Sequence, residues 1–305
     1  MTAWFSRLST KQKLLLGGGI YLLIAIVLFA AAGSAGRNDE FKPQDEFKLD
    51  PWISIKIGGL DLSINRAVLY LFLGAGLTVW AVTWIARRMQ RRPSKVQTAM
   101  EAAYGLMRNN ITEGNMDHRM AVKWFTFVGT LFMFIWFSNL LGYIPLPTSN
   151  EDLNIGGVSI PAFAIYAATA NISVTLVLTL VVWISYHVEG VRAQGFIPYF
   201  KSWIPAGVTG AAAVPIFAIE VISHFVRIIS LSVRLFANIL AGHLLILFMA
   251  GGLAVLLGVA ALGFITLPAA IAFYAFEVVL IATLQAFIFA TLTAIYLGGA
   301  VEAHH

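Results

Sequence analysis

The 305-residue chain has no cysteine and few charged residues. Without cysteine it can form no disulfides, no thiolate metal sites and no cysteine nucleophile. Charged residues make up 11% of the sequence and hydrophobic residues 59%, whereas about 25% of an ordinary soluble domain is charged. The net charge of +5 does not indicate nucleic-acid binding, because the basic residues lie mainly beside the ends of apolar runs, where they orient a membrane protein.

Six apolar runs are long enough to cross about 30 Å of hydrocarbon. Because open sheets cannot satisfy their backbone groups in lipid, the runs predict an all-α polytopic membrane protein. Five runs form the core of this fold, and the first is an extra N-terminal helix. If the first run is retained, alternation across the membrane places both termini in the cytoplasm. The predicted spans are about 14–33, 66–86, 120–144, 163–187, 211–249 and 268–299.

The start of the chain is open to two interpretations. Basic residues precede the first apolar run, as expected of a transmembrane helix with a cytoplasmic N-terminus. The same basic start, apolar centre and small residues AAAGSAG at 30–36 also resemble a secretory signal. We therefore expect three parts: 1–36 as an N-terminal helix or signal-like segment, 37–65 as an external loop with a short β-hairpin around Gly58 and Gly59, and 66–305 as the membrane domain.

The stretch after the second span predicts a helix on the cytoplasmic surface. Basic residues cluster between 87 and 95, with no acid before Glu101, which marks this side as cytoplasmic. Within 94–111, apolar side chains recur at helical spacing opposite polar ones, a pattern typical of an amphipathic helix at the membrane surface. The apolar side chains are Val96, Ala99, Met100, Ala103, Tyr104, Met107 and Ile111, and the polar ones are Lys95, Gln97, Glu101 and Arg108.

The fifth apolar run carries an unusual set of polar side chains. Five of them share one side of a helix, within about 80° of one another at 100° per residue. An ionised side chain at the bilayer centre costs at least about 2.5–3.5 kcal/mol, so this polar stripe must face protein or water rather than lipid. Its members are Glu220, His224, Arg227, Arg234 and Asn238.

Arg234 has no obvious partner within its own helix. The nearest acid on the same run, Glu220, lies about 21 Å away along the axis. Glu220 has closer candidates for a network that stabilises the bundle, namely His224 and Arg227. The last apolar run offers Glu277 as an acid. Unless another helix supplies a carboxylate, we expect Arg234 to meet one that belongs to another chain.

The segment SLSVRLFANILAGH at 230–243 combines an arginine, an asparagine four residues later and a histidine nine residues later. This pattern resembles the signature of subunit a of F-type rotary ATP synthases. The resemblance covers about 50–300. Four other segments are similar to parts of that family. RRPSKVQTAMEAAYG (91–105) resembles its surface helix, and LQAFIFATLTAIYL (284–297) resembles its last helix. FSNLLGYIP (137–145) and ANISVTL (170–176) resemble the end of its first hairpin helix and the start of the partner helix.

The resemblance implies a stator subunit that abuts a rotating ring of c subunits, each with one carboxylate in mid-membrane. It implies further partners in the b-subunit peripheral stalk, the membrane lipid and the rest of the FoF1 complex, in a bacterial-type inner membrane. Protons enter through one aqueous half-channel, neutralise a ring carboxylate and leave through a second, offset half-channel. Such a subunit is not itself catalytic and needs no cofactor or metal. Its last two helices are long and steeply tilted.

The resemblance also implies roles for single residues. Arg234 matches the essential arginine, which separates the half-channels and draws the proton off each arriving ring carboxyl. The other matches are Glu220, Ser223 and Arg227 for the cytoplasmic half-channel, Asn238, His243 and Gln285 for the opposite one, and Asn139, Asn171 and His224 for polar packing or channel lining.

Glu277 departs from the family pattern. It lies eight residues before Gln285, whereas the related acid of mitochondrial-type relatives lies seven before. Eight residues correspond to about 80° of helix rotation. Glu277 remains a candidate for the proton path, because a local bulge or a different partner would restore its orientation.

Two other functional classes compete with this interpretation. A secondary transporter would bind substrate near the midplane between repeated halves, but the sequence shows no such repeat. An intramembrane hydrolase could use His187, Glu189 and Ser223, but no metal-ligand spacing or nucleophile elbow is present. We expect His187 to be solvated at a cytoplasmic helix end beside Glu189. Protons are the expected coupling ion, although ring residues decide between H⁺ and Na⁺.

Overall fold

The computed structural model describes most of the predicted membrane domain. The first predicted span, at about 14–33, lies almost wholly outside the described residues, as does the external loop at 37–65 apart from its hairpin strands. The described residues are 12, 19–20, 23, 27, 49, 51, 56–57, 60–61, 63–144, 153–155, 158–160, 166–205, 207–208, 210–249 and 260–301.

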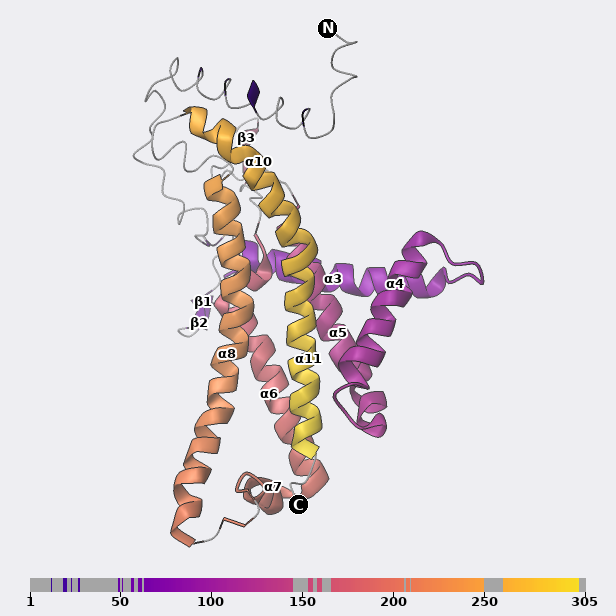
Figure 1. Cartoon of the computed structure of the whole chain (residues 1–305), viewed down its shortest axis with the longest axis vertical. Coiled ribbons are helices and arrows are strands. Elements are labelled where there is room, and N and C mark those ends of the chain that lie inside the picture. Colours follow the sequence, from indigo (N-terminus) through magenta and orange to yellow (C-terminus); the bar gives the residue numbers. More distant parts are fainter. Residues whose placement is uncertain are drawn as a thin grey trace. The chain divides into compact units, whose positions relative to one another are not determined.

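Helices dominate the described part of the chain (Figure 1). Two antiparallel pairs of short strands accompany them, and the first pair is the hairpin predicted around Gly58 and Gly59. In chain order the elements are β1 (Lys56–Ile57), β2 (Leu60–Asp61), α3 (Arg66–Arg87), α4 (Lys95–Gly105), η2 (Leu106–Thr112), α5 (His118–Gly142), β3 (Leu153–Ile155), β4 (Val158–Ile160), η3 (Ala168–Ala170), α6 (Ile172–Gln194), α7 (Phe196–Lys201), η4 (Gly210–Ala212), α8 (Ala213–Leu247), α10 (Ala260–Phe276), η6 (Glu277–Ile281) and α11 (Ala282–Val301).

The chain divides into two compact units. The first unit comprises 1–48 and 241–277, and the second comprises 49–240 and 278–305. The second unit contains α3 to α7, most of α8, and α11. The end of α8 and all of α10 belong to the first unit.

Five helices among the described residues are long and apolar enough to cross a membrane. This finding confirms the five predicted core spans and the all-α polytopic class. The fourth predicted span was misplaced: α6 begins at Ile172 rather than near 163, because Asn171 caps its N-terminus. The last predicted span, about 268–299, agrees with the candidate span Thr266–Val301, although α10 itself continues through Pro268. Transmembrane helices tolerate proline because neighbouring groups satisfy the freed backbone carbonyl.

Polar caps set the starts of the spanning helices. Asn65 accepts a hydrogen bond from the backbone N–H of Val68 at 3.1 Å at the start of α3. Asp117 similarly caps α5. These side chains satisfy N–H groups that have no partner within the helix. At the other end, α6 stops at Gly195, whose φ of 88° lies in the left-handed region that glycine adopts without strain.

The predicted surface helix is present as α4 and η2. Helix α4 passes into the π-helical segment η2, in which Met107 and Ile111 are buried. Val96, however, is exposed, whereas Gln97 is buried, because the Gln97 side chain hydrogen-bonds both backbone groups of Gln90. These bonds fold the preceding loop back onto α4.

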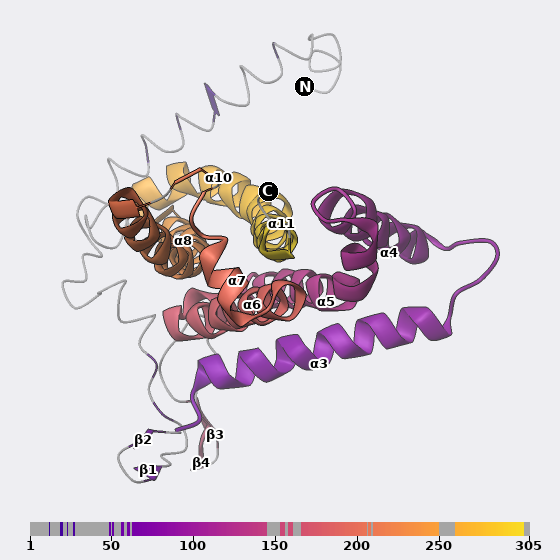
Figure 2. The same cartoon turned by 90° about the horizontal axis from the view of Figure 1, so that it is seen from below.

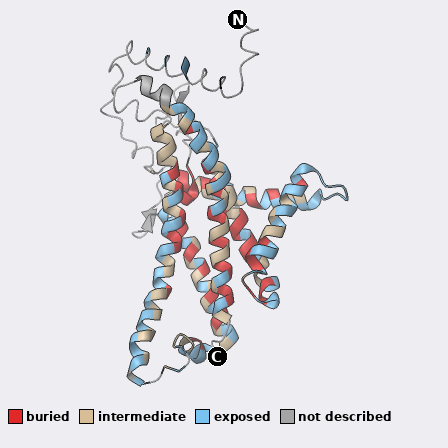
Figure 3. Ribbon diagram, viewed as in Figure 1, coloured by how far each residue is buried: buried red, intermediate tan, exposed pale blue. Residues whose placement is uncertain are grey.

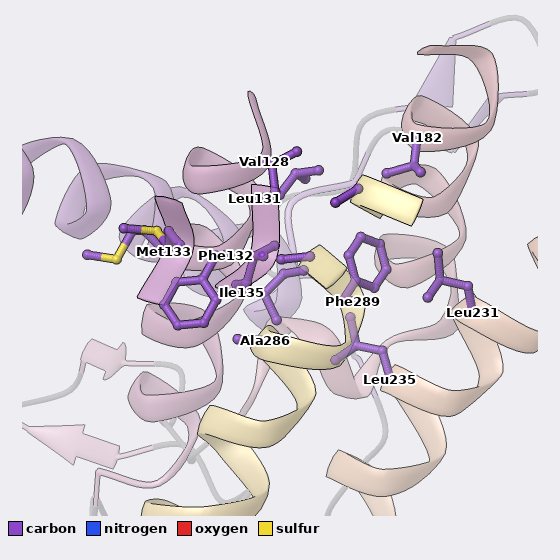
Figure 4. Packing of buried hydrophobic residues seen from close by; sticks show 14 of the residues in the cluster. Val128, Leu131, Phe132, Met133, Ile135, Val182, Leu231, Leu235, Ala286 and Phe289 are labelled. Carbon is purple, nitrogen blue, oxygen red and sulfur yellow. The ribbon is translucent and has the colours of Figure 1, made fainter. Parts of the chain in front are cut away.

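The hydrophobic core of the second unit lies between α5, α6, α8 and α11. Figure 4 shows Phe289 of α11 pointing toward Leu231 and Leu235 of α8, with Val182 of α6 and the α5 side chains nearby. Buried residues accordingly concentrate on the inward faces of these helices (Figure 3). The core thereby fixes which side of α8 faces the other helices.

The second unit is layered, with α3 packed against α5 and α11 packed against both α5 and α6. In Figure 2, α11 is seen nearly along its axis, whereas α3 is seen along its length. The two helices therefore cross at a large angle. Helix α3 has 22 residues and α8 has 35, or about 33 Å and about 52 Å of length. The first length suits an upright crossing of the bilayer, whereas the second requires a strong inclination.

Candidate functional site

The candidate site lies along α8, whose buried face is set by the core. Leu231, Leu235 and Ile239 are almost completely buried on that face, whereas Phe225 and Ile229 are exposed on the opposite side. The polar stripe predicted from the sequence flanks the buried face. It therefore occupies the boundary between packed protein and open surface, where a partner can reach it.

Arg234 is exposed on this boundary. Among the described residues, no acidic side chain lies within ion-pair distance of its guanidinium. Asn238, one turn further along, is exposed as well. Because an isolated arginine in a membrane span is costly, its position calls for a counter-charge from another chain or for water.

Glu220 and Arg227 form the second part of the stripe. Glu220 Oε1 lies 3.6 Å from an Arg227 Nη, and each side chain is 34% exposed. The Arg227 guanidinium also lies over the Tyr296 ring of α11, 5.2 Å from its centroid. Arg227 is thus paired within the chain, in contrast to Arg234. Ser223, on the same side of the helix, is half-buried.

His224 is buried in an aromatic cluster between α6, α7 and α8. Its Nδ1 is hydrogen-bonded to the Tyr186 hydroxyl at 3.0 Å, and its Nε2 lies 3.8 Å from Glu220 Oε1. The Trp203 ring packs against it with centroids 4.2 Å apart. His224 therefore belongs to a packed polar network as well as to the stripe.

The expectation that His187 is solvated was wrong. His187 is half-buried, and its Nδ1 is hydrogen-bonded to the Tyr199 hydroxyl at 2.7 Å. Its neighbour Glu189 is buried too and pairs with Lys123 of α5. Helix α6 extends past the predicted end of the span at 187, so both residues are enclosed by the bundle instead of ending in water.

Asn139 and Asn171 have separate structural settings. Asn139 is fully buried, donates to the backbone carbonyl of Ala282 at 3.2 Å and accepts from the Thr169 hydroxyl at 2.6 Å. It thereby ties α5 to α11 and η3. Asn171 accepts from the Ser173 backbone N–H at 2.8 Å as the cap of α6. Both arrangements fit polar packing.

Two further predicted residues, His243 and Glu277, lie in the first unit. His243 is half-buried near the end of α8. Glu277 is 7% exposed, and its carboxylate lies so close to the backbone of Gly242 that a Cβ there would collide with it. Gly242 thus makes room for the acid, a role that the sequence analysis missed because the partner lies 35 residues away (277 − 242).

Gln285 is buried on α11, in the second unit. The residues between Glu277 and Gln285 include the π-helical segment η6, Glu277–Ile281. A π-helical turn contains one more residue than the α-helical turn that it replaces, and such segments are frequent at functional sites. Of the two expectations for this separation, a local bulge or a different partner, the π-helical segment is such a bulge.

Comparisons with known proteins show which family the chain resembles. The family model described as "ATP synthase A chain" matches residues 68–298. The chain is 35% identical to the ATP synthase subunit a of Rubrobacter xylanophilus, over 83% of this chain and 91% of that protein. It is 33% identical to the subunit a of Parvibaculum lavamentivorans, over 90% of this chain and 98% of that protein.

The chain belongs to the ATP synthase subunit a family. This membership confirms the resemblance derived from the α8 motif. Together with the five spanning helices, it identifies a multi-pass membrane protein. Among the described residues of this subunit a, no group of three or more histidine, aspartate or glutamate side chains is arranged to hold a metal ion.

Sequence reasoning missed the aromatic side chains that surround the stripe. Tyr186, Tyr199 and Trp203 contact the two histidines, and Tyr296 stacks under Arg227. Aromatic residues make up 13% of this apolar chain, so from the sequence alone each of these side chains is expected to serve only in hydrophobic packing. The adjacent Tyr186 and His187, at the end of an apolar run, were the only local signal.

Proposed function

We propose that this subunit a is the proton-translocating stator of the ATP synthase, and that Arg234 mediates proton exchange with the carboxylates of the c-subunit ring. The observation that carries the proposal is the position of Arg234. It is exposed on α8, and no described acid of its own chain pairs with it. By contrast, the neighbouring Arg227 has an acid within the chain.

A permanent cation suits this role. A guanidinium stays charged at all accessible pH values, so it cannot relay a proton itself. When a ring carboxyl arrives, the guanidinium stabilises the ionised form and favours release of the proton. A neutral carboxyl can pass through lipid, whereas a carboxylate cannot. The fixed charge thus forces each ring subunit to exchange its proton before it passes.

The proposed half-channels use the other polar residues. Glu220, Ser223 and Arg227 form the cytoplasmic half-channel, and Asn238, His243, Gln285 and Glu277 form the opposite one. Glu277 is included because of η6. Eight residues that contain one π-helical turn rotate about as far as seven in a regular α-helix, which returns the two side chains to one face.

The proposal extends to the surroundings of the subunit. The c-ring contacts the open edge of α8, the b-subunit stalk holds the stator, and the F1 part performs the catalysis. The membrane is the inner membrane of a bacterial-type cell, with the basic segment 87–95 and the C-terminus in the cytoplasm. Residues 1–36 are a helix or a signal-like segment, 37–65 an external loop, and 66–305 the functional membrane domain.

The Arg234→Ala variant of the complete complex in inverted membrane vesicles tests this function. ATP-driven proton pumping and ATP synthesis should both be abolished, while subunit a remains assembled with the ring. Arg91→Ala, an exposed arginine outside the spans, is the matched control and should pump normally. Normal ATP-driven pumping by the Arg234→Ala complex would refute the proposal.

A further inference from the structure

Two histidines of the second unit lie side by side near the end of α6. His187 belongs to α6 and His224 to α8, and their ring centroids are 4.9 Å apart. Each ring has its Nδ1 hydrogen-bonded to a tyrosine hydroxyl, Tyr199 for His187 and Tyr186 for His224. Because Nδ1 is occupied in both rings, Nε2 is the nitrogen left for proton exchange.

Both Nε2 atoms are placed for such an exchange. His224 Nε2 lies 3.8 Å from Glu220 Oε1, which is too long for a direct hydrogen bond and suits a link through one water. His187 Nε2 is buried and has no hydrogen-bond partner in the described part of the chain. Buried polar groups normally have one, so this nitrogen is suited to a transient partner. The order in space is Glu220, His224, His187.

The surroundings hold this arrangement in place. Trp183 packs on His187 and Trp203 on His224, each at a centroid distance of 4.2 Å. Burial raises the pKa of the Tyr199 phenol above its usual value of 10.0, so the hydroxyl stays protonated and anchors His187. The charged and titratable groups that face the pair are Glu220, Arg227, Tyr186, Tyr199 and, through its contact with Tyr186, Tyr296.

We propose that His187 and His224 form a two-histidine proton relay between Glu220 and the surface at the α6–α7 turn. A protonated Glu220 gives its proton to His224 Nε2, which leaves a carboxylate and an imidazolium. The same Nε2 passes the proton to a water, which protonates His187 Nε2. His187, which is half-buried, then passes the proton from Nε2 to a second water, which carries it to the surface at the α6–α7 turn. The relay rests on the proposed path through Glu220.

Glutamine replacements separate a relay from packing. His187→Gln and His224→Gln keep a polar side chain but cannot carry a proton at neutral pH. Passive proton conductance is measured in vesicles that contain the complete membrane sector after F1 removal. We expect each variant to conduct about tenfold more slowly, which corresponds to about 1.4 kcal/mol of added barrier. His118→Gln, on a histidine with a 76% exposed side chain, is the matched control and should conduct at the wild-type rate.

Chemical rescue distinguishes the relay from a packing role, because added imidazole restores proton conductance only if the histidine carries protons. In His187→Ala, added imidazole should restore much of the conductance, because the small base replaces the missing ring at a partly exposed site. Assembly is checked by co-purification with the ring, and if His224→Gln does not assemble, His187→Gln and the rescue decide. Wild-type conductance in assembled His187→Gln would overturn the relay. If this outcome occurs and the Arg234→Ala complex does not pump protons, only the relay is refuted and the proposed function stands. If the Arg234→Ala complex pumps protons normally, both the relay and the proposed function are refuted.

Discussion

At the scale of single residues, the site depends on how each charge is placed relative to its neighbours. Arg234 and Arg227 lie on the same stripe of one helix, yet only Arg227 has an acid and an aromatic ring of its own chain beside it. The polar stripe itself was predictable from periodicity. That Arg234 lacks an acid of its own helix was predicted too, but the Tyr296 ring beside Arg227 was not, because Tyr296 comes from α11 and helix periodicity says nothing about neighbouring helices.

The close approach of Gly242 to Glu277 gives a prediction. In Gly242→Ala the new methyl would collide with the carboxylate, which is the flexible end of its side chain and can move. We therefore expect normal assembly but slower proton conduction, measured as in the relay experiment. The shorter acid in Gly242→Ala/Glu277→Asp should recover part of the rate. Equal rates for the wild type and Gly242→Ala would show that the position of this carboxylate is unimportant.

A second prediction concerns the buried amide of Asn139. Asn139→Leu leaves the Ala282 carbonyl and the Thr169 hydroxyl without these partners, and a buried unsatisfied polar group costs about 1–3 kcal/mol. The purified complex should lose thermal stability in detergent. The measurement is the temperature at which subunit a dissociates from the complex, and this temperature should fall. The exposed Asn109→Leu serves as the control and should leave this temperature unchanged.

At the scale of elements, the sequence predicted most reliably the helices that are marked by long apolar runs. All five core spans were identified, because runs of apolar residues longer than a bilayer have few alternatives. Their ends were less accurate, since α6 begins at a cap and α10 runs through Pro268. The π-helical segment η6 could be suspected only from the eight-residue separation of Glu277 and Gln285.

The π-helical segment gives a prediction at this scale. Deleting Val279, an exposed residue of η6, would allow a regular α-helix in which the acid lies seven positions before the amide, a rotation close to that of eight positions with one π-helical turn. This deletion should retain proton conduction. Deleting the equally exposed Ile229 from the regular helix α8 turns Arg234 by about 100° relative to Arg227 and should abolish it. Loss of conduction in both deletions would contradict the compensating role of η6.

At the scale of the whole molecule, the chain is a scaffold that presents one edge of α8. Helices α5, α6 and α11 bury the hydrophobic face of α8, and α3, which crosses the direction of α11 (Figures 1 and 2), packs on α5. A tilt of α8 in the membrane remains a prediction from its length and from the family resemblance. The crossing of α3 and α11 could not be derived from the sequence, because it depends on how side chains interlock. The partner of the exposed edge belongs to another chain.

Disulfide cross-linking tests this central claim most directly, because the chain contains no cysteine of its own. Ser230→Cys places a thiol on an exposed position of α8 one turn before Arg234, and a second cysteine is introduced one turn from the ring carboxylate. Oxidation should join the two subunits, since a disulfide requires Cβ atoms about 4 Å apart. Phe72→Cys, 70% exposed on α3, should not react with the same ring. An assembled complex in which Ser230→Cys gives no cross-link, or no more than Phe72→Cys, would contradict the account.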